Sequence, residues 1–237
     1  MTPSSHDDTL VSAIRQKHRA LCGRRALLVA LSGIDAAGKG YCAARIAQSL
    51  GEAKLHVAAI GADGWLNLPP VRFSRENPAA HFYEHAFRFN EMFETLVLPL
   101  KRNREIDLRM NYAEETATSY RRHRYELRDI DAILLEGIFL LKRSLRHHFD
   151  LACWVECSFE TALARAIKRC QEGLPSRETV RAFETIYFPA QRLHFERDAP
   201  QSSADLILCN EIEIGGMAGA GSGGSRFCFT SRGNHRK

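Results

Sequence analysis

The sequence has no apolar run that approaches the roughly 18 residues needed to cross a bilayer. Its first 25 residues also lack the apolar core of a secretory signal peptide. These two absences argue against a membrane-spanning protein and against export. We therefore expect a cytoplasmic protein without a membrane partner.

Paired cysteines are missing as well. The seven cysteines are scattered, and although Cys153 and Cys157 are four residues apart, no second pair stands at zinc-ligand spacing. Reduced thiols in a cytoplasmic protein are the simplest interpretation. A strong charge of one sign is absent too, because the net charge is only +5. This balance suits phosphorylated ligands and allows only weak affinity for nucleic acid.

What the sequence does contain is an alternation of strand and helix patterns. Buried apolar runs predict strands at residues 26–33, 54–63, 131–141, 150–157 and 204–210. Helical spacing predicts helices at residues 7–21, 38–50, 76–103, 158–172 and 177–196. In the helix 76–103, we expect Asn77 as the N-cap, Pro78 at the first helical position and Pro99 at the end. The alternation predicts an α/β fold with a mainly parallel, doubly wound sheet.

The chain length of 237 residues fits one such domain. We expect a leading amphipathic helix in residues 1–24 and the domain itself in residues 25–210. Within it, the arginine-rich segment 105–129 predicts a hairpin or small lobe, and the break "EGLP" predicts a lid over about residues 160–181. Residues 213–237 are dominated by glycine and serine and are expected to be disordered.

The segment Gly33-Ile34-Asp35-Ala36-Ala37-Gly38-Lys39 follows the first strand and precedes a helix. Its glycines allow backbone N–H groups to cradle phosphate oxygens, and the helix adds its positive N-terminus. Lys39 would reach the β- and γ-phosphates. The next residue is Gly40, where such loops normally carry the serine or threonine that binds Mg²⁺. Tyr41 cannot replace it, because its hydroxyl is misplaced; an ordinary glycine turn remains the alternative.

Two acids stand at the ends of buried apolar segments, at the edge where ligands bind in parallel sheets. Glu136 in "AILLEG" could hold Mg²⁺, which prefers oxygen ligands. Asp63 in "GADGW" could accept a proton from an attacking hydroxyl or bind the metal. The alternatives are a solvated strand-end acid and a simple Asp-Gly turn.

Arginines supply candidate cations for phosphoryl transfer. Arg165 and Arg169 share one helix face before the "EGLP" break, and Arg177 follows it. A solvated basic face is the alternative. The basic run 119–128 raises RNA binding as a further hypothesis, although one short run usually marks a solvated surface. Tyr83, near the start of the third helix, is a candidate for the acceptor pocket, with a place in the core as the alternative.

The motifs "GIDAAGKG", "ADGW", "LLEGIFLL", "TALARAIKRCQEG" and "YFPAQRLHFERDAPQSSADLILCN" together resemble the uridine kinase and phosphoribulokinase group of P-loop kinases, above all bacterial uridine kinase. The resemblance covers about residues 25–210. It implies a parallel sheet with flanking helices, a substrate lobe and a lid. It also implies transfer of the γ-phosphate of ATP, with Mg²⁺, to a hydroxyl of a nucleoside or another small molecule.

By the same resemblance, the loop from Gly33 through Gly40 to Tyr41 binds the nucleotide and Asp63 is the catalytic aspartate. Glu136 helps to hold Mg²⁺, and Tyr112 contacts the nucleoside. Arg165 and Arg169 match lid arginines.

The sequence departs from the family pattern at two places. Gly40 replaces the hydroxyl residue, and "RENPAAHFYEHAF" lacks the aspartate that the family's nucleoside kinases present to the ribose hydroxyls. Glu84 or His85 could substitute for it.

The sequence therefore predicts an ATP- and Mg²⁺-dependent kinase of a small alcohol, with the 5′-hydroxyl of uridine or cytidine as the best single acceptor. Pantothenate, glycerate, ribulose phosphate and nicotinamide riboside remain alternatives. A nucleotide-binding regulator without turnover also remains open, and so does a homo-oligomer.

Overall fold

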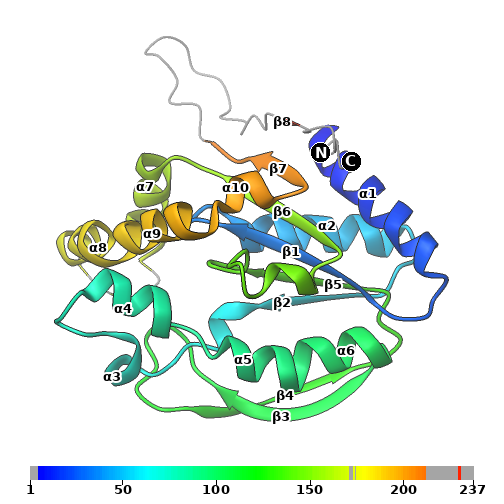
Figure 1. Ribbon diagram of the computed structural model, residues 1–237, viewed down its shortest axis with the longest axis horizontal. Coiled ribbons are helices and arrows are strands. Elements are labelled where there is room, and N and C mark those ends of the chain that lie inside the picture. Colours follow the sequence, from blue (N-terminus) through cyan, green and yellow to red (C-terminus); the bar gives the residue numbers. More distant parts are fainter. Residues whose placement is uncertain (1–4, 171–172, 174, 212–228, 231–237) are drawn as a thin grey trace.

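The computed structural model describes residues 5–170, 173, 175–211 and 229–230, and the structural statements below concern those residues. They form a central sheet with helices packed around it and a separate hairpin at one end (Figure 1). No helix in this part of the chain is both long and apolar enough to span a membrane.

The central sheet has six strands in the order β2-β5-β1-β6-β7-β8. Their bounds are β1 Leu27–Gly33, β2 Val57–Gly61, β5 Ala132–Gly137, β6 Leu151–Glu156, β7 Leu206–Cys209 and β8 Phe229–Thr230. Every neighbouring pair is parallel except β7 and β8. All seven residues of β1 are buried, because it lies inside the sheet and is covered by helices. The predicted α/β fold with a mainly parallel sheet is confirmed.

The helices enclose the sheet in the order that the alternation predicts. Their bounds are α1 Ser5–Leu21, α2 Lys39–Glu52, α3 Pro69–Arg72, α4 Pro78–His85, α5 Phe89–Met92, α6 Leu98–Asn103, α7 Phe159–Arg169, α8 Ser176–Ala182, α9 Phe188–Asp198 and α10 Pro200–Ser203. Short helical turns are η1 Ala62–Gly64, η2 Phe93–Val97, η3 Arg146–His148 and η4 Phe183–Tyr187. Helix α1 packs on α2 and β1 and buries Leu10 and Ile14 completely.

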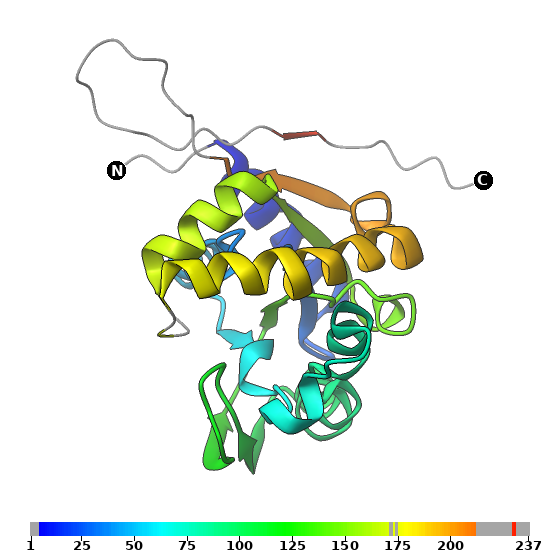
Figure 2. The same ribbon diagram turned by 90° about the vertical axis from the view of Figure 1, so that its left-hand side faces the viewer.

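The segment predicted as a hairpin or small lobe forms an antiparallel pair, β3 Ile106–Tyr112 and β4 Arg121–Leu127. Figures 1 and 2 place this pair at the end of the molecule opposite α7 and α9. Its outer positions are charged and exposed, and its inner positions are partly buried.

The predicted single helix 76–103 is wrong in two respects. It breaks at residues 86–88, because their backbone bonds to the segment after η1: Asn67 N donates to Ala86 O and Arg88 N donates to Trp65 O. In addition, Pro99 does not end the helix, because α6 continues past it to Asn103. The preceding turn η2 is a π-helix, and Pro99 stands in the first turn of α6, where its missing N–H is tolerated. The chain leaves the helix at Arg104, whose φ is 66°.

Three smaller differences concern element ends. Strand β2 covers only part of the predicted 54–63, and β5 ends at Gly137 instead of residue 141. Asn77 stands at the N-cap but makes no side-chain capping bond. The predicted lid 160–181 contains α7 and α8, and residues 171–172 and 174 lie outside the described residues. Most of the tail predicted as disordered also lies outside them, but its residues 229–230 form β8.

Candidate active site

The phosphate loop joins β1 to α2, as its sequence pattern predicts. Gly38 has a φ of 86°, and a Cβ at this position would stand 2.4 Å from Nδ2 of Asn210, so only glycine fits. Ala36 also takes a positive φ of 56°, an uncommon conformation for a residue with a side chain. Lys39 is buried at the start of α2, and its Nζ donates to the carbonyl of Ile34 at 2.8 Å.

Two side chains from distant segments of the chain donate hydrogen bonds to the backbone of this loop. Asn210, just after β7, donates from Nδ2 to the Ala37 carbonyl at 2.7 Å. Arg165 on α7 donates to the same carbonyl at 3.3 Å and to Oδ1 of Asn210 at 3.4 Å. Arg165 therefore contacts the loop backbone and is not among the residues that line the cleft described next. Sequence patterns placed Asn210 at the end of a predicted strand and assigned it no part in the site.

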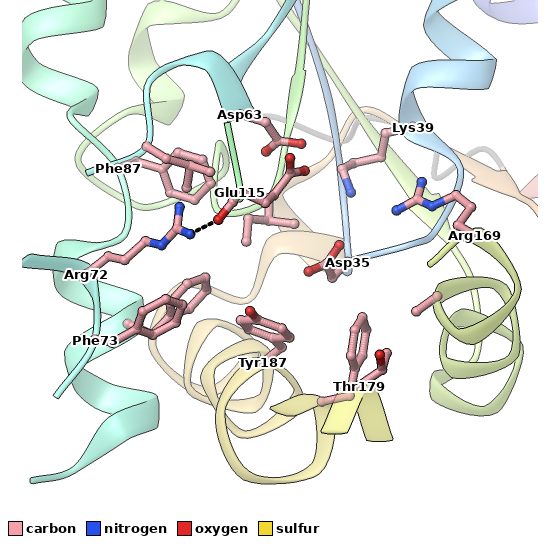
Figure 3. Close-up of a pocket in the computed structure, with 15 residues that line it drawn as sticks. Asp35, Lys39, Asp63, Arg72, Phe73, Phe87, Glu115, Arg169, Thr179 and Tyr187 are labelled. Atoms are coloured by element: carbon pink, nitrogen blue, oxygen red, sulfur yellow. Dashed lines mark hydrogen bonds between the residues drawn. The ribbon is translucent and has the colours of Figure 1, made fainter. Parts of the chain in front are cut away.

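A cleft that is partly open to solvent lies in front of the loop (Figure 3). One end of it carries the cationic groups of Lys39 and Arg169, with Asp35 of the loop beside them. Arg169 is the last residue of α7. Arg177 is exposed in the first turn of α8 and does not line the cleft, whereas the buried Thr179 of the same helix does. We call the end with Lys39 and Arg169 the donor end.

Asp63 and Glu136 lie next to each other because β2 and β5 are neighbours. Gly61 pairs with Glu136 in the sheet, and Asp63 follows in η1, two residues later. Burial, followed by the negative charge of Glu136, raises the pKa of Asp63 to about 7, and the positive charge of Lys39 opposes this rise. Burial also raises the pKa of Glu136. This crowding of two acids is relieved by a bound cation or by a proton.

The surroundings of Glu136 fit a Mg²⁺ site. Its Oε1 lies between two glycines, since a Cβ on Gly40 would stand 3.8 Å from it and a Cβ on Gly61 would stand 3.0 Å from it. Mg²⁺ is usually held by one or two carboxylates together with substrate phosphates and waters. In the described part of the chain, no group of three or more histidine, cysteine or acidic residues forms an all-protein metal site. Asp63 and Glu136 therefore fit a Mg²⁺ site that needs further oxygen ligands from a bound molecule or from water.

The opposite end of the cleft is lined by rings, and we call it the acceptor end. They come from three separate parts of the chain: Phe73 after α3, Phe82 and Phe87 around α4, and Phe183 and Tyr187 in η4. The rings of Phe73 and Phe82 stack at 5.7 Å, and that of Tyr187 is 5.0 Å from Phe82. Such a wall suits a flat, partly apolar ligand.

Two charged residues complete the acceptor end. Arg72 is only 4% exposed, its guanidinium carbon lies 4.9 Å from the centre of the Phe73 ring, and it donates to the backbone carbonyl of Glu115. Glu115 belongs to the loop between β3 and β4 and lines the cleft. Sequence patterns missed both residues, because neither belongs to a motif or to a periodic face.

Three solved structures resemble this chain over most of its length. A possible uridine kinase from Bacillus stearothermophilus is 19% identical, with a TM-score of 0.61 over 84% of this chain and 98% of that one. A protein described as a fructose transport system kinase from Silicibacter is also 19% identical, with a TM-score of 0.60 over 82% and 98%. A D-glycerate 3-kinase from Cryptococcus neoformans is 12% identical, with a TM-score of 0.65 over 95% and 100%.

The chain shares the fold of these three structures, each of which is described as a kinase. No protein-family profile matches it, and no curated protein sequence matches it. The structural likeness confirms the fold that the sequence motifs implied, and it leaves the acceptor open, because the three neighbours are named for different substrates.

Tyr83, which the sequence predicted as a contact of the acceptor, does not line the cleft. Tyr83 is 5% exposed, and its hydroxyl donates to Oδ2 of Asp198 at 2.5 Å, in the interface between α4 and α9. Neighbouring positions of a helix point in different directions. Phe82 therefore lines the cleft, whereas Tyr83 lies in the core beside Phe139 and His194.

Tyr112 lies against the turn that carries Asp63 and does not line the cleft. A Cβ on Gly64 would stand 2.2 Å from the Tyr112 ring, so the ring occupies the space of a side chain at position 64. This contact gives a physical reason for glycine at position 64.

The remaining predicted residues also lie outside the cleft. Tyr41 is 56% exposed on α2, with the guanidinium of Arg45 at 5.6 Å from its ring. Glu84 is exposed and forms an ion pair with Arg197 at 2.5 Å. His85 is exposed, with its ring 4.5 Å from that of His81. Neither Glu84 nor His85 is placed to replace the missing aspartate.

Proposed function

We propose that this protein is an ATP- and Mg²⁺-dependent phosphotransferase that moves the γ-phosphate to a hydroxyl of a small molecule. One observation carries the proposal: Asp63 lies in a single cleft between the cationic donor end and the ring-lined acceptor end. A hydroxyl group of a ligand at the acceptor end would thus meet a carboxylate on its path to the phosphate.

Each residue has a role that follows from its place. Asp63 accepts the hydroxyl proton, and its raised pKa suits a general base. The loop amides and Lys39 hold the phosphates, and Arg169 adds positive charge at the donor end. Glu136, together with Asp63, would hold Mg²⁺, and the bound metal would supply positive charge at the phosphate oxygens. Catalysis is mainly positioning and electrostatic stabilisation.

For the acceptor, we propose a nucleoside, with the 5′-hydroxyl of uridine or cytidine as the best single assignment. The five rings at the acceptor end support this assignment, because a pyrimidine base offers a flat face to them. Glycerate, pantothenate and ribulose phosphate have no such face. Nicotinamide riboside has one and is the strongest alternative.

A coupled assay of ADP release tests the proposal, with uridine, cytidine, nicotinamide riboside, glycerate, pantothenate and ribulose phosphate as acceptors. We expect turnover with uridine or cytidine at the highest kcat/KM. Turnover with glycerate alone would refute the nucleoside assignment and keep the kinase. Tight ATP binding without turnover on any acceptor would refute the kinase.

Gly40 favours a second candidate, a nucleotide-binding regulator without turnover. Its lack of a hydroxyl removes one metal ligand that such loops normally provide. Replacement of Lys39 by alanine discriminates between the two candidates, because a regulator would lose nucleotide binding and have no turnover to lose.

The hairpin gives less support to RNA binding than its sequence suggests. Arg121 forms an ion pair with Glu114 at 2.7 Å, and Arg124 forms one with Asp107 at 2.6 Å and another with Glu126 at 3.0 Å. These acids offset the positive charge that an RNA backbone would need. The proposed partner is therefore a small molecule.

A further inference from the structure

The acceptor end contains one acid whose role is still unassigned. Among the residues that line the cleft in the described part of the chain, three are acids: Asp35, Asp63 and Glu115. Asp35 belongs to the phosphate loop, and its Oδ1 accepts from the backbone N–H of Ala36 at 2.8 Å. Asp63 is the proposed base. Glu115 is the acid that the proposed phosphoryl transfer does not use.

Glu115 is held in place from a second segment of the chain. Arg72, which is buried, donates to its backbone carbonyl, and so joins the loop between β3 and β4 to the end of α3. Figure 3 shows the Glu115 carboxylate pointing toward that of Asp63. The charge of Glu115 also contributes to the raised pKa of Asp63, as expected of two nearby carboxylates.

A sugar-like acceptor needs a hydrogen-bond acceptor for its other hydroxyl groups. The segment around α4 does not supply one in the cleft, because Glu84 pairs with Arg197 and His85 is exposed beside His81. Phe82 and Phe87, which this segment does contribute, are apolar. An ionised carboxylate forms strong hydrogen bonds with hydroxyl donors and has oxygens for two of them.

We propose that Glu115 binds the vicinal hydroxyl groups of a ribose-like acceptor and thereby selects polyols over simple alcohols. The proposal rests on the proposed function and adds a substrate-contacting residue to it. Glu115 holds the sugar while the rings of the acceptor end contact the base. Its place beside Asp63 keeps the sugar close to the proton acceptor.

The neighbouring residue gives a matched control. Glu114 is exposed and pairs with Arg121 at 2.7 Å, away from the cleft lining. The experiment compares Glu115→Gln with Glu114→Gln in the full-length protein, with a non-hydrolysable ATP analogue and Mg²⁺ present. Calorimetry measures the affinity for uridine, 2′-deoxyuridine, 3′-deoxyuridine and 2′,3′-dideoxyuridine, and assays with ATP give KM and kcat.

We expect Glu115→Gln to weaken uridine binding by about tenfold to a hundredfold, the usual result when a hydrogen bond to a charged group is lost. KM should rise more than kcat falls. The affinity for 2′,3′-dideoxyuridine should fall by less than threefold, because that ligand lacks the two hydroxyl groups. Glu114→Gln should bind all four nucleosides as the unmodified protein does, and both variants should keep the affinity for the ATP analogue.

Equal behaviour of the two variants toward uridine would overturn the proposal, and so would an equal loss of uridine and dideoxyuridine affinity. If the unmodified protein phosphorylates a sugar acid or a sugar in place of nucleosides, the nucleoside assignment fails by itself. Glu115 is then tested with that polyol and its deoxy analogue, and the same two outcomes decide. Binding of no polyol at all would overturn both proposals.

Discussion

The donor end and the acceptor end of the cleft are built in different ways. The donor end depends on one continuous loop between β1 and α2, to which α7 adds Arg169. The acceptor end combines side chains from the α3–α4 region, the β3–β4 loop and η4. Asp63 lies between the two ends, on the turn that follows β2.

This difference explains why the donor end can be recognised from a short sequence motif, whereas the acceptor end cannot. A phosphate is held by backbone N–H groups and one lysine, so the loop conformation matters more than the chemistry of its side chains. An acceptor is recognised by side chains, which can come from any segment that reaches the cleft. Under the proposed function, the donor end therefore sets the type of reaction, and the acceptor end selects the substrate.

The largest expected effect comes from the donor end. Lys39→Ala removes the cation that we propose contacts the phosphates, so kcat/KM for ATP should fall by at least about a thousandfold. The affinity for the acceptor, measured by calorimetry without nucleotide, should change little. That result would show that the two ends bind their ligands independently. Equal losses of affinity for the nucleotide and for the acceptor would show that the two ends depend on each other.

Asp63→Asn tests the residue between the two ends. The amide cannot accept the hydroxyl proton, so kcat should fall by about a hundredfold or more, whereas the affinity for ATP and for uridine should change less. Rapid-quench assays check the chemical step. An unchanged kcat would exclude Asp63 as the base.

The same variant gives a pH-dependent effect on stability. The folded pKa of Asp63 is about 7, above the 3.8 of an unperturbed aspartate, so its ionisation destabilises the folded state. The stability that the neutral form contributes is present below about pH 4 and is lost as the pH rises to about 7. Without metal or nucleotide, in EDTA, the Tm of Asp63→Asn should exceed that of the unmodified protein more at pH 8 than at pH 5. Thermal denaturation at both pH values checks this, and a constant difference would contradict it.

Gly40→Ser should act on the metal alone. Apart from the chain neighbours and the backbone of its own helix, no described residue stands closer than 3.8 Å to a Cβ at this position, so serine fits. Its hydroxyl should replace a water on Mg²⁺ and lower the Mg²⁺ concentration for half-maximal activity by a few-fold, without a change in nucleotide affinity. Loss of nucleotide binding would show that the space at Gly40 serves another purpose.

The smallest effect on activity is expected for Tyr83→Phe, behind the acceptor end. Asp198 loses one hydrogen bond but keeps those from His194 and from the backbone N–H of Arg143. The free energy of unfolding should fall by about 1 kcal/mol in chemical denaturation, whereas KM for uridine should stay the same. A raised KM would place Tyr83 in acceptor binding after all.

Much of the fold could be predicted from the sequence because parallel strands buried on both sides produce continuous apolar runs. The failures occurred where tertiary contacts competed with local propensity. Residues 86–88 leave the helix because their backbone bonds to Trp65 and Asn67, and η2 makes room for Pro99. Neither contact is visible in a local pattern of residue types.

The sequence by itself determined the phosphate loop, the strands on which it depends and the positions of Asp63 and Glu136 near the ends of two of them. Each of these is a local property, set by glycine, by apolar runs and by the residue that ends a strand. Only the tertiary structure decided that Arg165 supports the loop, that Tyr83 belongs to the core, and that Arg72 and Glu115 meet at the acceptor end. Those placements depend on which segments pack together, because a cleft wall assembled from distant segments has no period or spacing in the sequence.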